Sequence, residues 1–85
     1  MDVKYSHHAM VRMNARGITK DHVQLVLDHP DSVDDQSEEN WVYSKLVKEE
    51  TKRYLYRVFV SMGELPVTVI TAYKTSKIQK YGYKI

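Results

Sequence analysis

Residues 6–18, SHHAMVRMNARGI, decide how the chain begins to fold. Ser6 is a favoured helix N-cap, and Gly17 is the residue expected where a helix ends in a left-handed turn. The stretch therefore predicts a helix that runs to about Arg16. Within it, His8 and Arg12 lie four residues apart and share one face, with Arg16 one turn further on. The first helix thus carries a cationic stripe next to an apolar one.

A second helix follows at once. Thr19 is its expected N-cap, and Val23, Val26 and Leu27 have the spacing of an amphipathic helix. It should end before Pro30, because the residue that precedes a proline avoids the helical region. On the other side of the first helix, residues 1–5 are either an edge strand or a simple lead-in.

The remainder of the chain predicts a meander of strands. Residues 31–40 are polar, acidic and aperiodic, and we interpret them as a loop. Strands are predicted at 41–47, 53–61 and 65–73, with turns at 48–52 and 62–64 and a possible helical turn within 75–81. If Val60 pairs with Val67, then Thr71 lies opposite Tyr56 and Lys74 opposite Arg53, and a bulge would shift this register by one.

These elements predict a single α+β domain over residues 1–85. Two N-terminal helices would pack on one face of a three- to four-stranded antiparallel sheet, and the opposite face would be partly open. With 42% hydrophobic residues and seven tyrosines, the chain is apolar enough to form a core.

Composition excludes several classes of protein. The chain has no cysteine, so it has no disulfides, no thiolate metal site and no cysteine nucleophile. It has no apolar run of membrane-spanning length and no signal-peptide pattern, so we expect a cytoplasmic protein without a membrane partner. Residues 28–39 contain six acids and no Lys or Arg, whereas residues 65–85 contain four lysines and no acid. Such asymmetry suggests a basic end that meets phosphate.

His8 is the leading candidate for chemistry in the first helix. Near the helix N-terminus the neutral imidazole is favoured, and a neutral imidazole can act as a general base. Arg12 could hold a phosphate oxygen. Alternatively, His8 is a structural histidine and Arg12 a member of a surface pair. His22 and His29 have no partners at a metal-binding spacing, so we expect neither a metal nor a cofactor.

The end of the last strand is the second candidate region. Thr71, Tyr73 and Lys74 combine a hydroxyl, an aromatic ring and a cation. Such groups bind phosphates and unpaired bases, which suggests an RNA site. The cations and the aromatic residue expected around it are Arg16, Arg53, Arg57, Lys77, Lys80 and Tyr81. The alternatives are a frayed basic tail and, for the strand aromatics, a role in the core.

The first helix also resembles a known motif. His8-Ala9, Arg12-Met13 and Arg16-Gly17-Ile18 resemble the HA-x-x-RM-x-x-RGI motif of a family of small uncharacterised domains. That family is grouped with RelE-like and BrnT-like toxins in the barnase–EndoU–colicin–RelE fold of metal-independent ribonucleases. The resemblance covers roughly residues 5–80. It implies a RelE-like fold and a toxin, partnered by an antitoxin protein, that cleaves RNA.

The expected reaction follows from this resemblance together with the residues. His8 would take the proton of a ribose 2′-hydroxyl, which attacks the adjacent phosphorus and leaves a cyclic phosphate. Arg12, Arg57 and Lys74 would stabilise the phosphoryl oxygens. Tyr73 or Tyr81 would position or stack a base, and Thr71 would donate a hydrogen bond. Members of the wider fold often use scattered Arg, Lys and Tyr without a strong base. A non-catalytic RNA- or ribosome-binding module and a protein-interaction domain remain the alternatives.

Overall fold

The computed structural model describes residues 2–63 and 66–82, and the predicted start of the last strand at Leu65 lies outside these ranges, as does Glu64 of the predicted turn. The elements, in chain order, are the strand β1 (Val3–Tyr5), the helices α1 (His7–Arg16) and α2 (Lys20–Asp28), the strands β2 (Ser32–Asp35), β3 (Asn40–Glu49), β4 (Lys52–Ser61) and β5 (Val67–Thr75), and the 3-10 helix η1 (Ile78–Tyr81). In the described part of the chain, no helix is long and apolar enough to cross a membrane.

Both helices begin and end where the local sequence predicts. The Ser6 hydroxyl oxygen accepts a hydrogen bond from the backbone N–H of Ala9 at 3.0 Å, and Gly17 adopts a left-handed φ of 68°. Thr19 and His22 form a reciprocal capping box at the start of α2. The structure thus confirms both predicted helices. The sequence predicts their ends well because capping depends on contacts within a few residues.

The sheet has five strands, in the order β1-β5-β4-β3-β2. β1 pairs with β5 in parallel, and the other neighbours are antiparallel. The prediction of three or four antiparallel strands was therefore wrong. β1 is only three residues long, and β2 lies inside the acidic segment that we interpreted as a loop. Charged residues are common on edge strands because they discourage pairing with other chains. The acidic residues of β2 therefore gave its segment the composition of a loop.

The register of the β4–β5 hairpin also differs from the prediction. Val60 pairs with Val69 rather than Val67, and Phe59 pairs with Thr71. The residue in between, Ile70, is therefore an extra residue in β5, which makes a β-bulge. Beyond the bulge the faces exchange, because strand side chains alternate. As a result Tyr73 shares the open face of the sheet.

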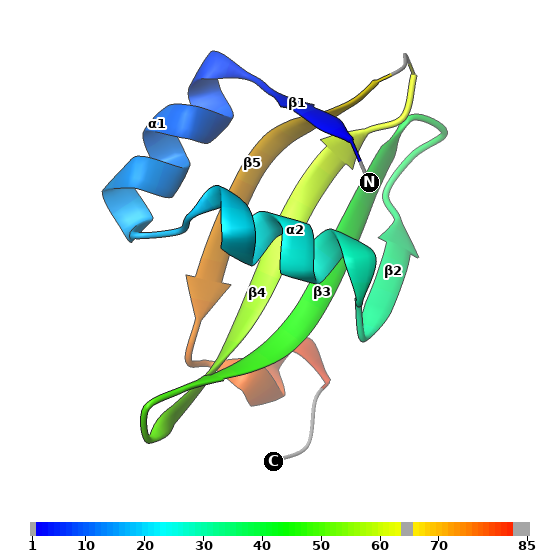
Figure 1. Cartoon of the computed structure of the whole chain (residues 1–85). Coiled ribbons are helices and arrows are strands. Elements are labelled where there is room, and N and C mark those ends of the chain that lie inside the picture. Colours follow the sequence, from blue (N-terminus) through cyan, green and yellow to red (C-terminus); the bar gives the residue numbers. More distant parts are fainter. Residues whose placement is uncertain (1, 64–65, 83–85) are drawn as a thin grey trace.

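Both helices cover one face of the sheet, α1 beside β5 and α2 across β4 and β3 (Figure 1). The core lies between the helices and this face. Its buried residues are Ala9, Met13, Ile18, Val23, Val26, Leu27, Tyr43, Tyr56, Val58, Val60, Val67, Val69 and Ala72. The opposite face is covered only in part, by η1.

Where β1 ends, the N-cap of α1 takes over the hydrogen bonding to β5. The Ser6 backbone N–H donates to the Val69 carbonyl and the Ser6 hydroxyl donates to the Ile70 carbonyl, each at 3.1 Å. At the other end of α1, Arg16 Nη1 donates to the Ala72 carbonyl at 2.8 Å. These bonds satisfy carbonyls on both sides of the bulge, so the helix position and the bulge support one another.

Candidate functional site

A row of polar side chains crosses the open face of the sheet. Ser32, Ser44, Arg57 and Tyr73 are direct neighbours on β2, β3, β4 and β5. Side chains at directly paired positions lie on the same face and within reach of one another. Ser44 is a buried polar residue of β3, only 2% exposed. The row is the polar centre of this face.

Arg57 is held within the row by two hydrogen bonds. Its Nη1 donates to Tyr73 Oη at 2.9 Å, and its Nε lies 3.4 Å from Ser44 Oγ, a long bond. The guanidinium carbon also lies 5.5 Å from the Phe59 ring centre and 4.7 Å from that of Tyr81, distances typical of cation–π contacts. Among the described residues no carboxylate lies within ion-pair distance of Arg57. The guanidinium is fixed in orientation and keeps N–H donors for a ligand.

A chain of hydrogen bonds runs from Arg57 through two tyrosine hydroxyls. Tyr73 Oη donates to Tyr81 Oη at 3.1 Å. Burial raises the pKa of Tyr73, whereas the hydrogen bond from Tyr73 lowers the pKa of Tyr81, with the nearby charges of Lys80 and Arg57 acting in the same direction. The proton of Tyr81 is therefore the more easily lost of the two. We call Arg57, Phe59, Tyr73 and Tyr81 the Arg57 cluster.

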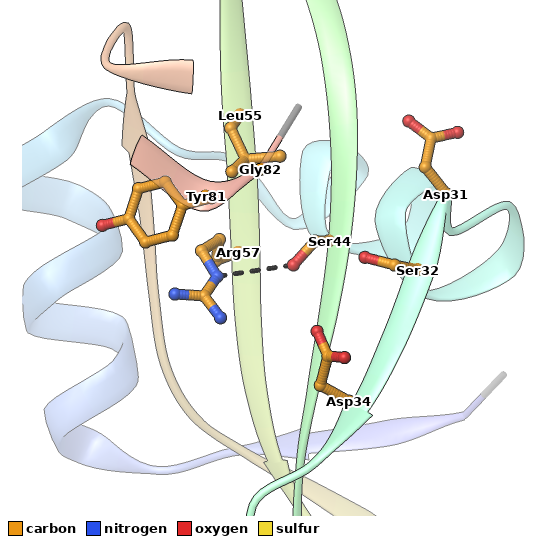
Figure 2. A pocket seen from close by; sticks show the side chains of 8 residues that line it. All are labelled: Asp31, Ser32, Asp34, Ser44, Leu55, Arg57, Tyr81 and Gly82. Carbon is orange, nitrogen blue, oxygen red and sulfur yellow. Dashed lines mark hydrogen bonds between the residues drawn. The ribbon is translucent and has the colours of Figure 1, made fainter. Parts of the chain in front are cut away.

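A cavity of about 320 Å³ opens beside the Arg57 cluster. Figure 2 shows Arg57 and Tyr81 on one side of it, Ser44 in the middle, and Asp34 on the opposite side. Its lining residues are Asp31, Ser32, Asp34, Ser44, Leu55, Arg57, Tyr81 and Gly82. Ile78 of η1 is buried and anchors the segment that carries Tyr81.

Several predicted site residues lie at or beside this cluster. Arg57 and Tyr73 pair directly, and Thr71 lies opposite Phe59 on the same face. The Arg16 guanidinium is 5.9 Å from the Tyr73 ring centre, and the Lys80 ammonium is 5.9 Å from that of Tyr81. Cations therefore flank the aromatic rings on both sides.

Lys74 lies on the other face of the sheet. Its ammonium forms an ion pair with Glu49 Oε1 at 3.0 Å, and Tyr56 Oη donates to the second oxygen of that carboxylate. These two hydrogen bonds, from Tyr56 first and then Lys74, lower the pKa of Glu49. Desolvation and the contact with Glu49 raise the pKa of Tyr56. Because adjacent strand residues point to opposite faces, Lys74 does not join Tyr73 and Arg57.

The side chains of His8 and Arg12 are exposed on α1 and have no hydrogen bond, ion pair or ring contact within the described residues. Arg53, near the start of β4, and Lys77, after the end of β5, are exposed as well. The predicted residues thus do not all converge on one cleft: the structure groups Arg57, Tyr73 and Tyr81 and leaves His8 apart. No group of three or more His, Asp or Glu residues that could hold a metal is found in residues 2–63 and 66–82.

Several residues of the site are not predicted by the sequence, among them Ser44 and Asp34. A serine within the apolar strand 41–47 was a local signal, because a buried hydroxyl needs a hydrogen-bond partner. Asp34 gave no such signal, since it lies in the segment that we interpreted as a loop.

Comparison with known proteins identifies a family. Residues 5–74 match the model of a family described as a domain of unknown function, DUF4258. No curated protein and no solved structure matches the chain significantly.

Proposed function

We propose that this chain, which belongs to the DUF4258 family, is a toxin-type ribonuclease that cleaves RNA without a metal. The observation that carries the proposal is Arg57, which is fixed by Tyr73, lies in an open cavity and has no carboxylate partner among the described residues. We therefore centre the proposed site on the Arg57 cluster rather than on His8.

The Arg57 cluster suits single-stranded RNA. A guanidinium binds phosphate oxygens through parallel hydrogen bonds, and aromatic rings stack on unpaired bases. Arg16 and Lys80 flank the rings and extend the positive charge along the path of a phosphate backbone. A cognate antitoxin would inhibit the protein by covering the same surface.

Cleavage would proceed by transesterification. The 2′-oxygen bonds to phosphorus as its proton passes to the phenolate form of Tyr81, and the P–O5′ bond breaks as the departing oxygen takes a proton from water. Arg57 stabilises the negative charge that grows on the phosphoryl oxygens, usually the largest catalytic contribution. The lowered pKa of Tyr81 increases the fraction of phenolate available near neutral pH.

The test is incubation of the protein with single-stranded RNA in EDTA, with DNA of the same sequence as the control. We expect RNA products that end in 2′,3′-cyclic phosphate and intact DNA, because the reaction needs a 2′-hydroxyl. Arg57→Ala should reduce the rate by about 100-fold or more, as expected when a group that stabilises transition-state charge is removed. Loss of cleavage in EDTA would contradict the proposal.

The second candidate is a non-catalytic RNA- or ribosome-binding module. It is favoured by the position of His8, because the Arg57 cluster contains no imidazole. This candidate predicts binding that weakens steeply as salt is raised, with no strand scission. Intact RNA that nevertheless binds to the wild type, and binds less to Arg57→Ala, would decide in its favour.

A further inference from the structure

The cavity beside the Arg57 cluster has two walls of different chemistry. Arg57 on β4 supplies N–H donors on one side, and the buried hydroxyl of Ser44 on β3 lies in the middle. Asp34 on the edge strand β2 supplies a carboxylate on the other side, as Figure 2 shows. Asp34 pairs with Val42 in the sheet, so its side chain shares the face of Ser44 and Arg57.

The carboxylate of Asp34 is available to a ligand, unlike that of its neighbour Asp31. Asp31 accepts a hydrogen bond from the Leu46 backbone N–H at 2.7 Å and lies 3.7 Å from the Lys45 ammonium. Asp34 has no hydrogen bond or ion pair within the described residues, and it is not within ion-pair distance of Arg57. A free carboxylate can accept two parallel N–H hydrogen bonds.

We propose that this cavity is a guanine-binding subsite, an inference that rests on the RNA-directed function proposed above. Asp34 accepts the N1–H and the 2-amino group of the base, Arg57 donates to O6, and the base lies against the Tyr81 ring. The cavity of about 320 Å³ is at the lower end of the range of roughly 300–1,000 Å³ for small-molecule sites, which suits one base.

Guanine is the base whose pairing edge matches these walls. It presents an acceptor, O6, followed by two adjacent donors, N1–H and the 2-amino group. Adenine and cytosine present an amino donor where the guanidinium of Arg57 also donates. Uracil presents a carbonyl on each side of its N3–H, and one of these would face the carboxylate of Asp34.

An arginine side chain of a protein partner also offers two parallel donors to a carboxylate. The charge of the cavity disfavours it, because Arg57 already occupies the opposite wall and would repel a second guanidinium. A neutral base with an acceptor oxygen makes use of Arg57 instead. The observations therefore favour a nucleobase.

The test is an NMR titration of the full chain with guanosine, inosine, adenosine and cytidine 5′-monophosphates. We expect the guanosine nucleotide to bind most tightly, and the inosine nucleotide, which lacks the 2-amino group, to bind about tenfold more weakly. Asp34→Asn should reduce the preference for guanosine over adenosine by about tenfold or more. Asp35→Asn is the matched control, because the neighbouring side chain points to the other face of β2, and it should keep the preference.

The outcomes separate this subsite from the proposed function. Equal binding of the guanosine and adenosine nucleotides, or equal effects of the two aspartate variants, would overturn the guanine subsite while RNA cleavage could still stand. Tighter binding of arginine amide than of the guanosine nucleotide would overturn it in favour of a protein ligand. Selective guanosine binding by a protein that neither binds nor cleaves RNA would uphold the subsite and reject the proposed function.

Discussion

The guanidinium of Arg57 is held in place by its neighbours and still has N–H donors for a ligand. Tyr73 and Ser44 accept hydrogen bonds from one side of its guanidinium, and the rings of Phe59 and Tyr81 limit its movement. Holding a cation in place before the substrate arrives reduces the entropy lost on binding. Such preorganisation is what a site for developing phosphoryl charge requires. The residue is therefore better suited to ligand binding than an ordinary surface arginine.

Tyr81 gives the residue-scale prediction. Its pKa is lowered, first by the hydrogen bond from Tyr73, so its phenolate forms at a lower pH than that of a free tyrosine. If the phenolate accepts the 2′-hydroxyl proton, the cleavage rate should rise with pH until Tyr81 is fully ionised. Tyr81→Phe should reduce kcat by about 100-fold and flatten this rise. The measurement is a pH–rate profile of both proteins.

The control for Tyr81 separates base catalysis from RNA binding. Tyr81→Phe retains the aromatic ring and should leave RNA affinity within about twofold, since stacking depends on the ring. His8→Ala serves as the comparison, because the sequence predicts His8 as the general base. An unchanged pH–rate profile in Tyr81→Phe together with a flattened one in His8→Ala would show that the general base is His8 and not Tyr81.

At the scale of elements, the bulge in β5 decides which residues form the site. It inserts Ile70 and moves Tyr73 onto the face of Arg57, whereas Lys74 goes to the face of Glu49. Ser6 fixes the bulge from α1, through its N–H to the Val69 carbonyl and its hydroxyl to the next carbonyl. The N-cap of α1 thus positions a site that it does not contact.

Ser6→Ala tests this coupling. The substitution leaves the Ala9 N–H and the Ile70 carbonyl without their partner, which should lower the free energy of unfolding by about 1–2 kcal/mol. It should also weaken RNA binding, because the orientation of Tyr73 depends on the bulge. Chemical denaturation and an RNA titration measure the two effects.

Thr19→Ala is the matched control for Ser6→Ala. Thr19 caps α2 by accepting from the His22 N–H, and no bond from its side chain to the sheet is found in the described residues. It should cost about 1 kcal/mol of stability without changing RNA affinity. Equal losses of RNA affinity in the two variants would show that the bulge does not depend on Ser6.

The parts of the fold that sequence predicts are those set by local contacts. Ser6, Gly17 and Thr19 define helix ends through bonds to residues a few positions away, so both helices were found. The strand edges and the bulge depend on pairing between distant segments, which a single sequence does not encode in an obvious pattern. β1 is too short and β2 too acidic to have a strand signature.

The same distinction applies to the candidate site. The sequence indicates Arg57, Tyr73 and Tyr81 by residue type alone. The strand register pairs Arg57 with Tyr73, and η1 brings Tyr81 to them. Lys74 has the same type of charge as Arg57, but the alternation of strand faces separates the two. Asp34 was missed because its role depends on β2 being a strand beside Ser44. The sequence therefore indicates which residues could bind or react, but not which of them lie together in the fold.

At the scale of the whole molecule, the face under the helices carries a polar network of its own. Glu49 on β3, Tyr56 on β4 and Lys74 on β5 connect three strands, and the His22 ring of α2 lies 5.2 Å from that of Tyr56. This network links the sheet to α2 at one end of the core. Because it spans four elements, weakening it should affect global unfolding rather than one local segment.

The charge of Glu49 makes this contribution depend on pH. Its folded-state pKa lies below the ordinary value of 4.5, chiefly because Tyr56 and Lys74 hydrogen-bond to the carboxylate. A lowered pKa stabilises the fold above the unfolded-state pKa, and this stabilisation is lost as pH falls through the folded-state value. The side chain of Glu49 is 27% exposed, so solvent screening limits the contribution to about 1 kcal/mol.

Glu49→Gln should therefore lower the free energy of unfolding by about 1 kcal/mol at pH 7, and this difference should shrink as pH falls below 4.5 and through the lower folded-state pKa of Glu49. Urea denaturation of both proteins between pH 7 and pH 3 measures the difference. Glu38→Gln, an exposed position between β2 and β3, is the control and should follow the wild type throughout. If the curves of Glu49→Gln and the wild type stay parallel down to pH 3, the carboxylate contributes no pH-dependent stability. The contacts of Tyr56 and Lys74 with Glu49 would then be interchangeable with those of a neutral amide.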